Sequence, residues 1–203
     1  MQGPPLDTKR LEAFSDGVIA IIITIMVLEL RVPHEASFAA LTPLWPVIVS
    51  YILSFVYLGI YWNNHHHMLQ VTTRVSGGVL WANLHLLFWL SLVPFVTAWM
   101  GSTHFASIPT ALYGVVLLMA AISYTILQNC IVAVEGKDSL LARAVGADRK
   151  GRISIAAYVT AIIVSFFAPY VSDVLYVTVA LIWLVPDPRI ERIVGQAPRA
   201  MTE

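Results

Sequence analysis

Long apolar runs separated by short polar segments dominate the sequence. A helix needs about 20 apolar residues to cross the hydrocarbon core of a bilayer, and six runs approach or exceed that length. We therefore predict an all-α integral membrane protein in which one module, residues 1–203, contains six transmembrane helices. The last two runs are short and joined by Pro169 and Tyr170, and two crossings are preferred to one re-entrant pair. Pro94 predicts a kink in the third helix. The runs are 14–32, 44–68, 79–100, 108–134, 153–168 and 171–185.

The composition agrees with a lipid environment. Of the 203 residues, 58% are hydrophobic and 12% are charged, whereas an average soluble domain is about a quarter charged. The surface of a soluble protein of this size must face water and could not accommodate so much apolar area. The formal net charge of zero gives no indication of a nucleic-acid partner. The single cysteine, Cys130, excludes an intrachain disulfide and a cysteine-based zinc site.

Basic residues are unevenly distributed among the polar segments. Eleven of the twelve fall in the N-terminal segment, the segments 69–78 and 135–152, and the C-terminal tail, whereas Arg31 falls on the opposite side. Because cytoplasmic loops collect Lys and Arg, we predict a multi-pass protein of the cell membrane with both termini in the cytoplasm. The segment 135–152 is either a solvated loop or carries a short amphipathic helix near 139–145. The eleven residues are Lys9, Arg10, Arg74, Lys137, Arg143, Arg149, Lys150, Arg152, Arg189, Arg192 and Arg199.

Polar residues gather at the predicted cytoplasmic ends of the first three helices. Polar side chains within a membrane segment usually face the interior of the bundle, so we expect a network there that holds the first helix in place. Alternatively, Ser15 or Asp16 caps the first helix, whose dipole favours an acidic residue in its first turn. The residues of the expected network are Arg10, Phe14, Ser15, Asp16, His65, His66, His67, Asn83 and His85.

The three consecutive histidines, 65–67, raise the question of a metal site. Adjacent residues on a helix point about 100° apart, and metal-binding histidine pairs on one helix are spaced i, i+4. Ligands from elsewhere in the chain would be needed, so we predict no metal and no cofactor. Soluble-enzyme motifs such as a phosphate-binding Gly loop or a nucleophile elbow do not occur in the sequence. We therefore predict that the chain is not an enzyme, and an intramembrane enzyme built on Ser15, Asp16 and these histidines is the remaining alternative.

The first predicted helix carries an unusual stripe. Beyond Asp16 it is almost entirely aliphatic, and Thr24 is its only polar residue before Glu29. A stripe of apolar rings with one hydroxyl suits a pore, because hydrophobic constrictions gate by dewetting. Alternatively, Thr24 only bonds to the carbonyl one turn earlier. By helical periodicity one face holds Gly17, Ile21, Thr24, Ile25, Leu28 and Arg31, and a competing, wholly apolar face holds Ala20, Ile23, Val27 and Leu30.

The stretch Arg10-x-x-x-Phe14-Ser15-Asp16, which opens the first transmembrane helix, resembles the RxxxFSD motif of the endosomal/lysosomal potassium channel family (transmembrane protein 175 and its bacterial homologues). YWNNHHHML at 61–69 and NLHLLFWLSLVPFVT at 83–97 resemble the second and third helices of that family. The resemblance implies a potassium-permeable channel without a TVGYG filter, formed by a homotetramer in the lipid bilayer with the first helix of each subunit around the pore.

The resemblance also implies positions for the pore constriction. It places a constriction ring at Ile21, with Ile25 and Leu28 as further rings of a hydrophobic gate and Thr24 as a ring of hydroxyls. A register shift of two residues would put Ile23, Val27 and Leu30 there instead.

A secondary transporter or proton-coupled carrier of a small cation is the main alternative function. Such a protein would be expected to have broken helices and charged residues at mid-membrane. Here Asp16, Glu29, Arg31 and Asp173 all fall near helix ends, which argues against it. A non-conducting membrane scaffold also remains open at the level of sequence.

Overall fold

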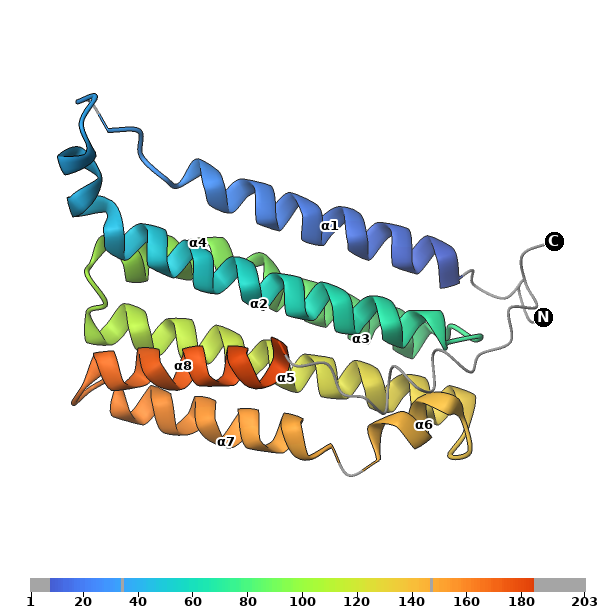
Figure 1. The fold of residues 1–203 in the computed structure, drawn as a ribbon. Helices are drawn as coiled ribbons and strands as arrows, with labels where there is room; N and C mark the ends of the chain where they lie inside the picture. The colour runs from blue at the N-terminus through green and yellow to red at the C-terminus, as the bar shows by residue number, and fades with distance from the viewer. Residues whose placement is uncertain (1–7, 34, 147, 185–203) are drawn as a thin grey trace.

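The computed structural model describes residues 8–33, 35–146 and 148–184, and within these ranges it contains helices and no strand. The long helices lie side by side and run approximately parallel or antiparallel (Figure 1). The elements are α1 (Thr8–Leu28), the 3₁₀ helix η1 (Phe38–Leu44), α2 (Trp45–Gln70), α3 (Gly77–Ser91), α4 (Val93–Ser102), α5 (Ser107–Glu135), α6 (Leu140–Val145), α7 (Arg149–Val164) and α8 (Pro169–Leu184).

Four helical segments are long and apolar enough to cross a membrane. They are Thr8–Leu28, Phe38–Gln70, Gly77–Ser102 and Ser107–Glu135. The helices α7 and α8 have 16 residues each, which is fewer than the typical length of a crossing. The chain is therefore an all-helical membrane protein with at least four candidate spans, and six crossings stay a prediction.

The structure changes the predicted boundaries of the first helix and divides the third. The first helix begins at Thr8 rather than near 14 and ends at Leu28, because backbone hydrogen bonds continue through a polar segment as readily as through an apolar one. Ser15 and Asp16 therefore lie inside α1, and the alternative in which one of them caps the helix is wrong. The third run divides at Leu92 into α3 and α4, which confirms the interruption expected from Pro94, a residue without an N–H group.

The segment between α5 and α7 forms a short helix, α6. Ser139 caps its start, because the Ser139 side chain accepts a hydrogen bond from the Ala142 amide at 3.2 Å. Of the two alternatives for this segment, the short helix is the one present.

The helix α1 lies at one edge of the bundle. It packs on α2, α3 and α4, while α5 packs on α3 and α4 on one side and on α7 and α8 on the other, as Figure 1 shows. Along α1, Ile19, Ile22 and Met26 are buried against these neighbours. The opposite face of α1 is not covered by the rest of the described chain.

Hydrogen bonds between buried side chains set the packing of the central helices. The Ser54 hydroxyl on α2 bonds to the Thr97 hydroxyl on α4 at 2.6 Å and to the Tyr113 hydroxyl on α5 at 3.0 Å. The Tyr57 hydroxyl on α2 donates to the carbonyl of Tyr176 on α8 at 2.6 Å. Because lipid supplies no partner for a polar group in the bilayer core, these bonds fix how α2, α4, α5 and α8 meet.

The start of α1, the α2–α3 loop and α6 lie at the same end of the bundle (Figure 1), which we call the basic end. Most basic residues of the described chain lie at this end. They are Lys9 and Arg10 at the start of α1, Arg74 in the α2–α3 loop, Lys137 and Arg143 between α5 and α7, and Arg149, Lys150 and Arg152 at the start of α7. Arg31 follows α1 at the opposite end. Arg189, Arg192 and Arg199 lie outside the described residues. The charge asymmetry of the sequence thus corresponds to an asymmetry of the fold.

Candidate functional site

A chain of three buried polar side chains joins α1, α2 and α3 at the basic end. The Ser15 hydroxyl donates to the Leu11 carbonyl at 2.8 Å and accepts from Asn83 Nδ2 at 2.9 Å, and Asn83 Oδ1 lies 2.7 Å from His65 Nε2. All three side chains have no solvent exposure. Because the Ser15 proton is committed to Leu11, the Asn83 amide nitrogen must face Ser15 and its oxygen must face His65. An amide oxygen only accepts, so His65 Nε2 carries a proton.

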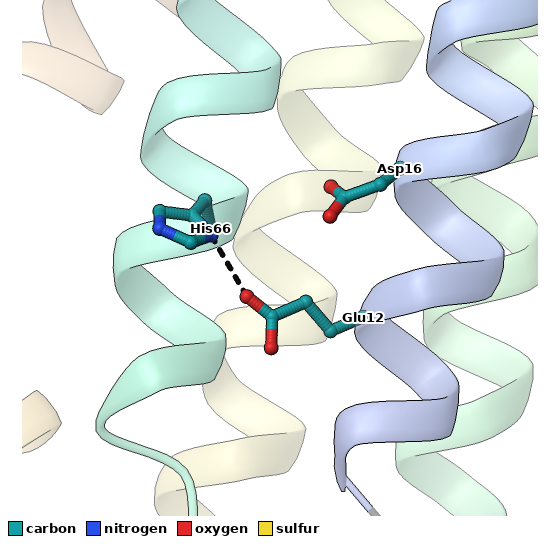
Figure 2. Close-up of side chains that lie close together, drawn as sticks. All are labelled: Glu12, Asp16 and His66. Carbon is teal, nitrogen blue, oxygen red and sulfur yellow. Dashed lines mark ion pairs between the residues drawn. The ribbon is translucent and has the colours of Figure 1, made fainter.

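A second layer of contacts joins α1 and α2 beside this chain. The Trp62 indole Nε1 donates to Asp16 Oδ1 at 3.0 Å, and His66 Nδ1 lies 2.8 Å from Glu12 Oε1. The His66 ring stacks on the Trp62 ring, with centroids 5.9 Å apart and an interplanar angle of 16°. Figure 2 shows Glu12 and Asp16 reaching from α1 toward His66 on α2. These contacts hold the start of α1 against the end of α2.

The structure brings together some of the residues expected in the polar network and leaves others outside it. Arg10 and Phe14 are exposed on α1. His85 lies elsewhere, where its Nδ1 is 3.1 Å from the Ser123 hydroxyl on α5 and its Nε2 accepts from the Trp89 indole at 3.0 Å. His67 is half-buried. The network therefore divides into a buried chain, Ser15–Asn83–His65, and a more exposed group that contains Asp16 and His66.

Two residues of this site, Glu12 and Trp62, were not anticipated from the sequence. A signal for both exists in the spacing. Glu12 and Asp16 are four residues apart on α1, as are Trp62 and His66 on α2, and residues at i and i+4 lie on the same helical face. The spacing shows which residues share a face, but only the packed pair of helices shows that the two faces meet.

The apolar stripe on α1 faces away from its own subunit. Ile21, Ile25 and Leu28 have relative exposures of 58%, 44% and 80%. Thr24 lies among them, is exposed, and donates to the Ile21 carbonyl at 2.9 Å. The hydrogen bond to the preceding turn, which the sequence left as an alternative, is therefore present, and the Thr24 oxygen remains accessible as an acceptor.

The competing stripe is divided between exposed and covered positions. Ile23 is half-buried and packs against the core of the subunit, Leu30 is half-buried, and Val27 is 45% exposed. An uncovered apolar face on an edge helix can meet lipid, another copy of the chain, or a pore. The polar contacts at the basic end hold this face in one orientation.

Known proteins similar to this chain point to one family. The family described as endosomal/lysosomal potassium channel TMEM175 matches residues 10–94. A protein named as a potassium channel from Chryseobacterium sp. (strain P1-3) is 58% identical over 183 residues, which cover 90% of this chain and 95% of that protein. The human endosomal/lysosomal proton channel TMEM175 is 34% identical over 88 residues, which cover 36% of this chain and 18% of the human protein.

A solved structure is also similar. It is the crystal structure of a lysosomal potassium-selective channel TMEM175 homologue from Chamaesiphon minutus, with a TM-score of 0.77 and 27% sequence identity, covering 87% of this chain and 96% of that chain. The similarity thus extends over most of this chain and nearly all of the solved one.

Proposed function

We propose that this chain, which belongs to the endosomal/lysosomal potassium channel TMEM175 family, forms a passive potassium channel whose pore is lined by α1. The observation that carries the proposal is the 58% identity to a bacterial protein named as a potassium channel, over 90% of this chain. Potassium is accordingly the proposed permeant ion, and the proposed pore has no TVGYG-type filter. Because the family consists of channels, no catalytic reaction is assigned to the chain.

The proposed constriction consists of Ile21, Ile25 and Leu28, with Thr24 adding a hydroxyl between the apolar rings. The exposure of these side chains supports this register, because a residue that lines a shared pore must not be covered by its own subunit. Ile23, which would replace Ile21 in the other register, packs against the core. Apolar rings of this kind gate a pore by controlling whether water enters it.

The proposed assembly is a homotetramer with α1 of each subunit at the central axis. The position of α1 at the edge of the bundle supports an assembly of several copies (Figure 1), because the exposed stripe of one helix cannot enclose an ion path alone. The proposed number of four subunits rests on the resemblance of this chain, through its RxxxFSD motif, to bacterial members of the family.

The proposed location is the cell membrane. In the proposed topology the chain crosses it six times and both termini lie in the cytoplasm. At about 1.5 Å per residue, each of the 16-residue helices α7 and α8 spans about 24 Å, against a hydrocarbon core of about 30 Å. A modest local thinning of the bilayer accommodates that difference. The basic end, which holds most of the described lysines and arginines, becomes the cytoplasmic end by the positive-inside rule.

A potassium flux assay on purified protein in liposomes tests the function. We expect potassium to move down its gradient without a coupled ion, since the proposed channel is passive. Absence of flux from well-folded, correctly inserted protein would contradict a channel. Flux that depends on a second ion would favour the proton-coupled carrier instead.

Two matched asparagine variants test the register. Ile21→Asn should increase potassium flux, because a polar side chain at the constriction favours water in the pore. Ile23→Asn is the control, with the same substitution two residues away on the half-buried side of α1. An increase with Ile23→Asn and none with Ile21→Asn would show that the alternative register of Ile23, Val27 and Leu30 is the correct one.

A further inference from the structure

We propose that Glu12, Asp16 and His66 form a binding site for a divalent first-row transition-metal ion that bridges α1 and α2. One ligand atom from each of the three side chains lies within 4.8 Å of the other two. Figure 2 shows the two carboxylates of α1 and the imidazole of α2 directed toward a common space. The histidine run lacked further ligands on its own helix, and α1 supplies them at the i, i+4 spacing that a single helical face requires.

The distances suit an ion after small side-chain adjustments. Zinc–nitrogen and zinc–oxygen bonds of about 2.0–2.2 Å place two ligand atoms of one ion roughly 3.3–4.4 Å apart. The three ligand atoms lie at most 4.8 Å apart, which exceeds the upper end of that range by only about 0.4 Å. The side chains of His66 and Glu12 are partly exposed, at 32% and 24% of their surface, although the ligand atom His66 Nδ1 is itself covered. The site therefore lies just below the surface of the bundle.

The donor set selects the class of metal. Imidazole suits zinc, copper, iron and nickel, whereas sites for magnesium and calcium are built from oxygen ligands alone. One nitrogen and two carboxylates leave at least one coordination position for water. Two charged carboxylates that lie close together repel each other. A bound divalent cation offsets that repulsion.

Neighbouring side chains orient the proposed ligands. Trp62 Nε1 holds Oδ1 of Asp16 at 3.0 Å, which leaves Oδ2 for the ion. His66 Nδ1 and Glu12 Oε1 lie 2.8 Å apart as an ion pair, without the alignment of a hydrogen bond. A metal ion that binds both atoms takes the place of the proton between them, which is released on binding. On the other side of the ring, Nε2 lies 2.8 Å from the Gln70 side-chain amide. In the metal-bound tautomer Nε2 carries the proton, and the Gln70 amide accepts it through its oxygen once rotated.

Metal titration of the purified full-length protein in detergent, after treatment with a chelator, tests the site. Co²⁺ is the probe, because its visible absorption changes with coordination, and Zn²⁺ should displace it. We expect one Co²⁺ per chain. His66→Ala and Glu12→Gln should each weaken binding by at least about tenfold, the lower limit for changes to a metal site, while Trp62→Phe should weaken binding by roughly 10–100-fold through loss of the bond to Asp16.

His67→Ala is the matched control, because it removes the adjacent histidine of the same helix while leaving the three ligands intact. Binding should then be unchanged. Equal losses in the His66 and His67 variants would overturn the proposal in favour of non-specific binding by the histidine run. Absence of Co²⁺ binding to monodisperse wild-type protein would also overturn it, as would wild-type affinity in Glu12→Gln. None of these readouts requires ion conduction, so the result does not depend on the proposed channel function.

Discussion

Replacing Asn83 by alanine removes the central member of the buried chain between α1, α2 and α3. The resulting loss of stability has two parts, one for each hydrogen bond of Asn83. Asn83 Nδ2 donates to Ser15 and Asn83 Oδ1 accepts from His65. In Asn83→Ala the His65 N–H is left without its partner in a fully buried position. An unpaired buried donor costs about 1–3 kcal/mol, although interhelical hydrogen bonds measured in a membrane protein average only about 0.6 kcal/mol.

Ser15→Ala isolates the contribution of the bond between Ser15 and Asn83, because the effect of this substitution on stability should depend on whether Asn83 is present. In the wild-type background the variant leaves Asn83 Nδ2 without an acceptor, and we expect a loss of about 1–2 kcal/mol in the free energy of unfolding. In the Asn83→Ala background that donor no longer exists. The Ser15 hydroxyl then contributes mainly its local bond to Leu11, so the loss should be below about 0.5 kcal/mol. The predicted coupling energy, which is the difference between these two losses, is therefore about 0.5–2 kcal/mol.

The measurement is reversible unfolding of the four proteins of this cycle in mixed micelles of increasing SDS content, followed by helical circular dichroism. Asn63→Ala is the control, because Asn63 is exposed on the same helix as His65 and its replacement should change stability by less than about 0.5 kcal/mol. Equal losses for Ser15→Ala in both backgrounds, within about 0.5 kcal/mol, would refute the reasoning, because independent sites add to that precision.

Two further predictions concern packing and the α2–α3 loop. Gly114→Ala should destabilise the protein by about 1–3 kcal/mol in the same assay, because a Cβ there would overlap the Tyr176 hydroxyl. Gly59→Ala, where nothing lies within 4 Å of the new Cβ, should leave stability unchanged or raise it by up to about 1 kcal/mol, and a similar loss in both variants would contradict this account. Glu135→Ala should accelerate hydrogen exchange in the segment 69–78 about tenfold, since the Glu135 carboxylate accepts from the amide of Thr73 at 2.6 Å and from the next amide at 2.7 Å. Unchanged exchange, measured by mass spectrometry, would show that this contact does not hold the loop.

Much of the helical layout follows from hydrophobicity. Lipid offers no hydrogen-bond partner, so an apolar run long enough to cross must satisfy its own backbone as a helix. That reasoning located the four candidate spans, and the missing N–H group of Pro94 located the interruption of the third. The start of α1 was placed too late, because a helix that extends beyond the bilayer leaves no mark in the apolar pattern.

The polar contacts at the basic end were only partly predictable. Polar residues at one depth suggested a network, and Ser15, His65 and Asn83 do form one. His85 has the right depth but is turned toward Ser123 on α5. Depth in a membrane follows from position along the sequence, whereas the neighbour that a side chain meets depends on how each helix is rotated about its axis.

The sequence by itself determined that the chain is helical, which segments are apolar enough to span, and which residues share the face of Ile21, Ile25 and Leu28, because these properties depend on composition and on the fixed period of one helix. Only the tertiary structure decided that this face is uncovered, that His65 rather than His66 is buried, and that Glu12 and Asp16 meet His66. The physical reason is that contacts between helices depend on their relative rotation and translation. Those are set by packing and hydrogen bonds between residues far apart in the chain, such as Ser15 and Asn83.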